Sequence, residues 1–357
     1  MSRSDRKREH IQYALTTGQS RQAGFDDIAF VHHSLPNTSV SDINLSTKIG
    51  ELLLSSPIFI NAMTGGGGEE TLKINHDLAL AAKETGLALA VGSQMSALKD
   101  PKERKTFEIV RKTNPNGVIF ANIGSEATVS QARDVVEMIG ADALQIHLNV
   151  IQELAMPEGD RSFKGSLDRI QKIASQLEVP VIIKETGFGM SSETIRLLET
   201  SEAIAFDVGG YGGVNFAKIE NSRRERRMSY FDDWGIPTPI SIIEATSTTS
   251  RTVIASGGIQ SPLDLLKSLA LGANAGGMAG YLLKLLLERS LKDLIDEINI
   301  FHQDLRMMMC ALGVTNIHKL NTVPLVISGN SYHWLQARGF KPEKFSRRQR
   351  NDEQKDG

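Results

Sequence analysis

The chain has 357 residues, of which 40% are hydrophobic and 23% are charged, a composition typical of a globular protein. Its 40 basic and 42 acidic residues leave a formal net charge of −2, which gives no support for electrostatic binding to nucleic acid. The single cysteine, Cys310, excludes an intrachain disulfide and fits a reducing compartment. No apolar run approaches the ~20 residues of a membrane span, and no secretory signal is visible. The sequence therefore predicts a cytoplasmic protein that binds neither nucleic acid nor membrane.

Residues 1–56 precede the repeating part of the chain. The segment DRKREHIQYALT, residues 5–16, has the pattern of a basic helix, and an irregular arm that includes His32, His33 and Pro36 follows it. We expect this helix and arm to lie over the mouth of the domain that comes next.

Short β-rich apolar runs alternate with longer amphipathic stretches over residues 57–290. Helical spacing is evident in 72–86, 129–140, 166–177 and 261–272. The apolar runs between such stretches are IFINAM (58–63), LALAVGS (87–93), GVIFANI (117–123), ALQIHLN (143–149), VPVIIKE (179–185), AIAFDVG (203–209), TVIASGG (252–258) and NAGGMAG (274–280). Eight such units predict an α/β fold, a (β/α)₈ TIM barrel. An open doubly wound sheet, which has the same local pattern, is the alternative.

The remainder of the chain reads as an extension of this barrel. Residues 291–313 have the pattern of one or two amphipathic helices with enough apolar surface for a subunit interface, and residues 320–329 read as an extended segment. Together they predict a C-terminal helical extension over 291–340. The polar residues 341–357 predict a mobile tail.

Glycines are concentrated where the predicted strands end. They occur at 65–68 after the first strand, at 209–213 after the sixth, at 257–258 after the seventh and at 276–280 around the eighth. In a barrel these positions share one face, and the loops after the seventh and eighth strands commonly hold a phosphate. Each cluster alone is explained by a tight turn. Four clusters together predict a phosphorylated cofactor or substrate.

Polar side chains occupy the same predicted rim. Asn61, Ser93, Asn122, Lys184 and Asp207 lie at or near the ends of five strands, where burial is costly without a partner. Lys184 follows an apolar run and therefore needs an anion. That anion is either Glu185 or Asp207 in an ion pair, or the anionic form of a reduced flavin.

The fourth strand ends in a group of polar residues. Alternation places Gln145, His147 and Asn149 on one side of the strand, and Gln152 and Glu153 follow. One carboxylate with amide and imidazole neighbours suits Mg²⁺ that shares phosphate oxygens of a substrate. A solvated loop carboxylate is the simpler interpretation of Glu153 taken alone.

Two clusters of arginine and lysine could supply further cations. Arg6, Lys7 and Arg8 lie on the predicted basic helix, and arginines at 223, 224, 226 and 227 follow the sixth strand. Such runs are usually solvated faces. If either folds over the mouth, its guanidinium groups would bind phosphate.

Several of these segments together resemble the type II isopentenyl-diphosphate isomerase family. The resemblance runs from Arg6 to about Gly339 and depends on RKREH (6–10), NAMTGG (61–66), GSQ (92–94), ANIG (121–124), QIHLN with QE (145–153), KETGFGM (184–190), DVGGYGG with NFAKIE (207–220) and ASGGI (255–259). It implies a (β/α)₈ fold that binds FMN and Mg²⁺, uses NADPH to reduce the flavin, and forms a homo-oligomer, a tetramer or an octamer. The activity it implies is the interconversion of isopentenyl diphosphate and dimethylallyl diphosphate in isoprenoid biosynthesis.

The same resemblance implies roles for individual residues. It places Glu153 on Mg²⁺ and gives catalytic roles to Lys184, His147 and Gln152. The residues implied around FMN are Ala62, Met63, Thr64, Ser93, Asn122, Lys184, Gly257, Gly258, Ile259, Ala279 and Gly280. Those implied around the diphosphate substrate are Arg6, Lys7, Ser93, Gln94, Met95, His147, Asn149 and Gln152.

The implied reaction is a 1,3-proton shift with the reduced flavin as the acid–base group. The sequence departs from the family pattern at Val214 and Gly209, where threonine and serine are usual. The lost hydroxyl predicts FMN binding weaker by about 1–2 kcal/mol. The alternative function is an FMN- or phosphate-binding barrel with a non-catalytic or different flavin oxidoreductase role. A 2-hydroxy acid oxidase would show a His–Gly–x–Arg segment, which is absent near 252–262, and an inosine-monophosphate dehydrogenase would need a loop cysteine.

Overall fold

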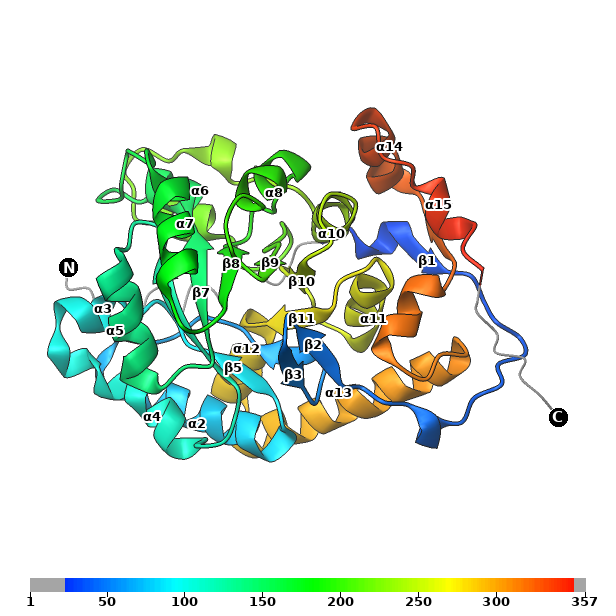
Figure 1. Ribbon diagram of the computed structural model, residues 1–357, viewed down its shortest axis with the longest axis horizontal. Helices are drawn as coiled ribbons and strands as arrows, with labels where there is room; N and C mark the ends of the chain where they lie inside the picture. Colours follow the sequence, from blue (N-terminus) through cyan, green and yellow to red (C-terminus); the bar gives the residue numbers. More distant parts are fainter. Residues whose placement is uncertain (1–22, 350–357) are drawn as a thin grey trace.

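The computed structural model describes residues 23–349, and its centre is a closed ring of eight parallel strands (Figure 1). The strands are β4 (Ile58–Ile60), β5 (Ala88–Ala90), β6 (Ile119–Gly124), β7 (Ala143–Leu148), β8 (Val181–Glu185), β9 (Ala205–Asp207), β10 (Thr252–Ser256) and β11 (Ala275–Met278). The last strand, β11, pairs in parallel with the first, β4. This pairing confirms the predicted (β/α)₈ barrel and excludes the open sheet.

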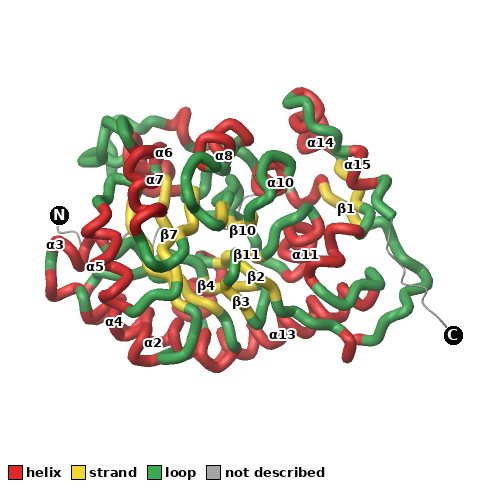
Figure 2. Tube along the Cα trace, viewed as in Figure 1, coloured by secondary structure: helices red, strands yellow, loops and turns green. Residues whose placement is uncertain are grey.

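Helices surround the ring, as Figure 2 shows in red around the yellow strands. Two begin with a capping box, in which the side chain of each of two residues accepts the backbone N–H of the other, at Thr128 with Gln131 and at Ser261 with Asp264. The outer helices are α2 (Gly68–Thr85), α4 (Lys105–Thr113), α5 (Val129–Ile139), α7 (Ser166–Gln176), α8 (Ser192–Leu198), α10 (Thr238–Thr246), α11 (Pro262–Ala270) and α12 (Gly280–Glu288). Shorter helices lie in the loops that follow strands: α3 (Met95–Lys99), α6 (Val150–Ala155) and α9 (Phe216–Asn221).

A hairpin formed by β2 (Thr47–Ile49) and β3 (Leu52–Leu54) closes the end of the barrel where the strands begin. Ile49 and Leu54 belong to the same buried cluster as Phe59 and Phe120 inside the ring. The backbone N–H of Gly50 donates to the hydroxyl of Thr252, the first residue of β10 (3.1 Å). This part of the 1–56 region thus covers the end opposite to the mouth, contrary to expectation, because its apolar side chains fill the open base of the ring.

The remaining elements form one flank of the barrel. Residues 291–313, expected as one or two helices, contain the single helix α13 (Leu291–Ala311). The expected extended segment contains β12 (Leu325–Ile327), which pairs antiparallel with β1 (Ile28–Phe30). The chain continues through α14 (Gly329–Ala337) and α15 (Glu343–Ser346), and its 3₁₀ turns are η1 (Phe25–Asp27), η2 (Val40–Asp42), η3 (Pro101–Glu103), η4 (Ser229–Phe231) and η5 (Ile317–Thr322).

Part of the stretch expected as a mobile tail from residue 341 packs against the rest of the structure. Helix α15 packs against β12, and Phe345 contacts the main core. A guanidinium nitrogen of Arg348 donates to the carbonyl of Ala270 (2.6 Å). Residues 341–349 are therefore part of the folded body, since one aromatic side chain and one arginine give this polar stretch enough contacts. Between residues 23 and 349, no helix is both long and apolar enough to cross a bilayer.

The buried His302 of α13 predicts acid sensitivity. Its Nε2 lies 2.7 Å from the hydroxyl oxygen of Ser56, and burial, with a smaller contribution from Arg306, lowers its pKa to about 4. The unfolded chain takes up this proton near pH 6.5 and the folded one only near pH 4, so stability falls as the pH decreases through this interval. Urea unfolding measures how far the free energy of unfolding falls between these two pH values. We expect this fall to be smaller by about 3 kcal/mol in His302→Gln than in the wild type. The exposed His318 gives the control, His318→Gln, and equal pH slopes for both variants would contradict the assignment.

Candidate functional site

A cavity of about 720 Å³ opens at the ends of the barrel strands, a size typical of ligand sites. Strand tips and the loops after them line it, so residues as far apart in the chain as Asn61 and Tyr281 share one space. The predicted site residues on its wall are Ala62, Met63, Thr64, Ser93, Met95, Asn122, His147, Asn149, Gln152, Glu153, Lys184, Gly257, Gly258, Ile259, Ala279 and Gly280. Val214 and Gly209, where the expected hydroxyls are missing, also line it.

Three predicted residues are not placed on this wall. Gln94 is fully buried, donates from Nε2 to the carbonyl of Val135 (2.9 Å) and accepts from the backbone N–H of Asn122 (3.1 Å). It therefore bridges a strand and a helix, and its predicted contact with substrate is not supported. The other two, Arg6 and Lys7, lie outside the described residues.

The cavity floor carries a buried ion pair. The Nζ of Lys184 lies 3.2 Å from Oδ2 of Asp207, whose side chain is 0% exposed, and donates to the hydroxyl of Ser256 (3.2 Å). Of the two ion pairs considered from the sequence, the one with Asp207 is correct, because the carboxylate of Glu185 instead accepts the backbone N–H of Gly187 (2.6 Å). Lys184 is thus paired and at the same time lines the cavity, where a second anion would meet its charge.

Buried amides connect this ion pair to the imidazole at the mouth of the barrel. Asn61 donates to Asp207 (2.8 Å), Gln145 donates to Asn61 (3.2 Å), and Asn122 donates to Gln145 (3.1 Å). The Nδ1 of His147 lies 2.9 Å from Oδ1 of Asn122. We call the three amides of Asn61, Gln145 and Asn122 the amide relay. Alternation along β7 indicated that Gln145 and His147 point together, but only the closed ring brings Asn61 and Asp207 to them.

A second part of the wall is acidic. The carboxylate of Glu153 accepts from the backbone N–H of Asp160 (2.7 Å) and from the amide of Asn149 (2.9 Å). Burial raises its pKa, and the charges of Asp160 and Glu126 act in the same direction. Glu126, Glu153, Glu158 and Asp160 all line the cavity. These carboxylates offer the oxygen ligands that Mg²⁺ prefers.

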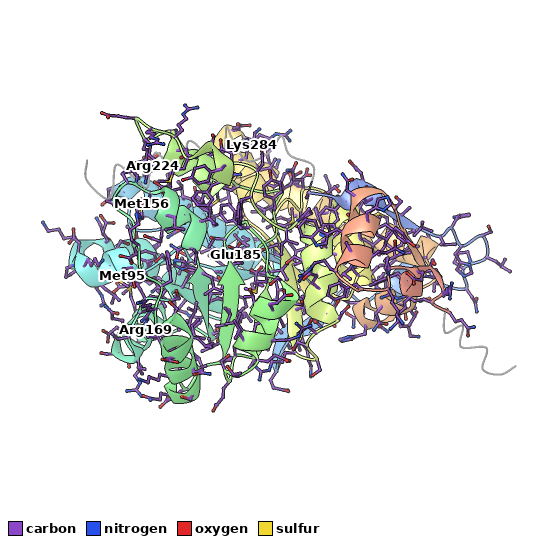
Figure 3. The ribbon with its side chains drawn as sticks, turned by 90° about the horizontal axis from the view of Figure 1, so that it is seen from above. Met95, Met156, Arg169, Glu185, Arg224 and Lys284 are labelled. Atoms are coloured by element: carbon purple, nitrogen blue, oxygen red, sulfur yellow. The ribbon has the colours of Figure 1, made fainter. Side chains whose placement is uncertain are left out.

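Two arginines hold the short helix α6 that carries Gln152 and Glu153. Arg224 donates to the carbonyls of Ala155 and Met156, and Arg161 donates to the carbonyls of Glu153 (2.5 Å) and Met156 (2.7 Å). Figure 3 shows Arg224 beside Met156. These contacts satisfy the last carbonyls of the helix and fix the direction of its side chains.

Arg223 is the residue of the predicted arginine cluster that reaches the cavity. Its side chain is 14% exposed, and its two terminal nitrogens pair with Glu220 (2.6 Å) and Glu158 (2.7 Å). Burial lowers its pKa and the hydrogen bonds to Glu158 and Glu220 raise it, with the balance upward. Arg226 and Arg227 are exposed, as expected of solvated charges. Glu158, Asp160 and Ser256 were missed from the sequence; only for Ser256, next to the glycines at 257–258, was there a signal.

Glycines bring the backbone close together where β9, β10 and β11 end. A Cβ at Gly257 would lie 2.0 Å from the carbonyl oxygen of Gly210, and one at Gly213 would lie 2.7 Å from the backbone nitrogen of Gly258. The nine-residue helix α12 begins at Gly280 on the same wall. Backbone N–H groups and a helix N-terminus at one place suit a phosphate group.

Comparisons with known proteins agree with this arrangement. Residues 155–326 match the family model described as FMN-dependent dehydrogenase. Among solved structures, a mandelate oxidase variant with an FMN adduct has a TM-score of 0.65 at 16% identity, covering 89% of this chain and 92% of that chain. A flavocytochrome b2 variant with sulfite bound has a TM-score of 0.67 at 17% identity, covering 89% of this chain and 83% of that one. At such identities these likenesses support the fold alone.

Relatives over the whole length are more informative. The chain is 58% identical over 349 residues to isopentenyl-diphosphate delta-isomerase of Bacillus licheniformis, a match that covers 98% of this chain and 100% of the relative. It is 60% identical over 349 residues to the enzyme of that name from Bacillus cereus, and this match also covers 98% of this chain and 100% of the relative. With this identity along nearly all of its length, the chain belongs to the isopentenyl-diphosphate delta-isomerase family.

Proposed function

We propose that this protein interconverts isopentenyl diphosphate and dimethylallyl diphosphate by a 1,3-proton shift that requires reduced FMN and Mg²⁺, with NADPH as the reductant. The observation that carries the proposal is 58–60% identity to isomerases of that name over 98% of the chain. The cavity supports it, because one wall offers glycine backbone and a helix N-terminus while another offers carboxylates, amides and an imidazole.

The residues present fit FMN. Gly257, Gly258 and Gly280 would hold its phosphate, because side chains there would block the close backbone approach that the glycines allow. Lys184 on the cavity floor would face the isoalloxazine ring and favour its anionic reduced form. When bound, reduced FMN supplies the acid–base group for the two proton transfers. The chain's own contribution is to orient the five-carbon substrate and to exclude water around it.

The residues also fit Mg²⁺ shared with a diphosphate. Within residues 23–349, no group of three or more His, Cys, Asp or Glu side chains could hold a metal alone. Glu153 would therefore provide one ligand and the diphosphate and water the others, a common arrangement for this ion. His147, Asn149 and Gln152 lie on the same wall and would contact the diphosphate.

The direct test is an anaerobic assay of the purified protein loaded with FMN. Isopentenyl diphosphate, NADPH and Mg²⁺ are added, and dimethylallyl diphosphate is followed by mass spectrometry. We expect product only when the flavin is reduced. Protein that retains FMN but forms no dimethylallyl diphosphate would refute the proposal.

The assigned metal ligand makes a separate prediction. Glu153→Gln should reduce turnover by at least about tenfold at every Mg²⁺ concentration, because the amide is a much poorer ligand for this ion. FMN should stay bound, since the proposed phosphate cradle is on β10 and β11, across the ring from α6. The isomerase rate over a magnesium titration and the flavin absorbance measure the two effects. Glu178→Gln, at an exposed position before β8, is the control, and a Glu153→Gln variant with the same magnesium response as this control would disprove the role.

A further inference from the structure

The amide relay links two ionisable groups that lie on either side of strand β8. Asp207 is on β9 and His147 is on β7, while Asn61 follows β4, three places from β9 in the ring. The hydrogen bonds from Asp207 to Asn61 and from Gln145 to Asn61 therefore cross the interior of the barrel, and the rest of the relay joins the adjacent strands β6 and β7. Its three amides and Asp207 are at most 3% exposed, so water does not compete for these hydrogen bonds.

The direction of every hydrogen bond in the relay follows from its carboxylate end. Asp207 is paired with Lys184 and as a carboxylate can only accept, so the NH₂ of Asn61 must face it. The oxygen of Asn61 accepts from the backbone N–H of Ala62 (2.8 Å), which can only donate and fixes the same orientation independently. An amide is otherwise ambiguous between its oxygen and its nitrogen, and the network resolves the choice.

The orientation of Asn61 fixes the orientations of the next two amides in the relay. With its oxygen facing Gln145, Asn61 requires an NH₂ from that residue, and Gln145 in turn presents its oxygen to the NH₂ of Asn122. Asn122 is left with its oxygen toward Nδ1 of His147, 2.9 Å away. That nitrogen must carry a proton. A neutral His147 therefore has its proton on Nδ1 and none on Nε2.

We propose that Asp207, through the amide relay, holds neutral His147 in the Nδ1–H form, so that binding of the diphosphate at this ring takes up one proton from solvent onto Nε2. Phosphate oxygens in an ionised diphosphate accept hydrogen bonds, and Nε2 without a proton can only accept as well. The proton gained at Nε2 makes the ring an imidazolium that donates at both nitrogens, to Asn122 and to the ligand. Asn61, Gln145, Asn122 and Asp207 are thus positioning residues.

Other charged groups near the ring bear on this step. Lys184 is the register partner of His147 on β8, and its charge is matched by Asp207. Glu126, which follows β6, and Glu153, on α6, line the same cavity and favour a cationic ring. The tautomer itself is set by Nδ1 and the relay and does not depend on these charges.

The first experiment identifies the tautomer in the absence of any diphosphate. In the FMN-loaded protein labelled with ¹⁵N-histidine, two-dimensional NMR of the ring nitrogens at about pH 8 should show His147 protonated at Nδ1 and not at Nε2, with His147→Gln used to assign the signals. Asn122→Leu removes the acceptor and should release the ring from this form. Asn221→Leu removes a buried amide outside the relay and should leave the His147 signals unchanged. Wild-type His147 with its proton on Nε2 would overturn the proposal.

The second experiment counts protons with inorganic pyrophosphate and Mg²⁺. Calorimetric titrations in buffers of different ionisation enthalpy give the number of protons taken up per ligand bound. Near pH 8 the wild type should take up about one proton more per ligand than His147→Gln. Asn122→Asp keeps the acceptor but adds a charge that holds the ring protonated beforehand, so the excess should disappear while pyrophosphate still binds. Equal uptake by the wild type and His147→Gln would overturn the proposal.

The inference rests on the proposed function only for the choice of a diphosphate as ligand. Neither experiment requires turnover. If the isomerase assay fails but NMR shows the proton on Nδ1, the proposed function is refuted and the relay is not. If the isomerase assay succeeds but the proton is not on Nδ1, the relay alone is refuted.

Discussion

Methionine in place of Lys184 is expected to reduce isomerase turnover by about 100-fold or more and to lower the free energy of unfolding by about 3–5 kcal/mol. Asp207 has no exposed surface and lies 3.2 Å from the lysine nitrogen, so the variant leaves an uncompensated buried carboxylate. The cavity floor also loses the cation that would face the flavin. Urea unfolding and the anaerobic isomerase assay measure the two effects.

A double variant separates the effects on stability and on activity. Lys184→Met with Asp207→Asn removes both charges, and we expect it to recover most of the lost stability, since a neutral pair avoids the cost of one buried charge. Activity should remain low because the cavity still lacks its cation. If the Lys184→Met variant has the free energy of unfolding and the isomerase turnover of the wild type, the ion pair contributes to neither stability nor activity.

Alanine in place of Gly257 is expected to weaken FMN binding by about 10- to 100-fold, the loss of one charge-assisted hydrogen bond or its equivalent. Gly257 has φ +98°, and an added Cβ would lie 2.0 Å from the carbonyl oxygen of Gly210, which is backbone and cannot move aside alone. The strand end must shift, and the proposed phosphate cradle shifts with it. Fluorescence titration of the apoprotein with FMN measures the dissociation constant.

Gly339→Ala is the matched control for this substitution. Gly339 has φ +82°, but nothing lies within 4 Å of the position of an added Cβ. Both variants therefore carry the strain of a left-handed residue, about 1–3 kcal/mol in stability, and only Gly257→Ala has the collision. Equal FMN affinity of the two variants would show that the cradle is not the flavin phosphate site.

Much of the fold follows from local sequence signals. Buried parallel strands are short apolar runs and the helices between them have a 3.6-residue period, so each βα unit is visible within its own segment. The glycines after the seventh and eighth strands can also be recognised within their own short segments, and so can the polar residues at the end of the fourth strand. These signals placed Lys184, His147 and Glu153 at the mouth of the barrel, where the structure has them.

Other parts of the site depend on which way a side chain turns at a strand end. Gln94 follows a run that ends at the rim, and nothing in its neighbours indicates that it turns outward to the carbonyl of Val135. The Asp207–Asn61 contact joins residues 146 positions apart across the interior of the ring. Such contacts depend on ring closure and register, which a single sequence does not encode locally.

The β2–β3 hairpin has a consequence for synthesis of the chain. Its bonds at Gly50 and Thr47 join residues that are 202 and 227 positions further along. At about 5–20 residues per second, the ribosome needs roughly 10–45 s to deliver those partners. During this time Ile49 and Leu54 have no barrel to enter, so this segment of the nascent chain needs protection from aggregation until translation reaches the last strand.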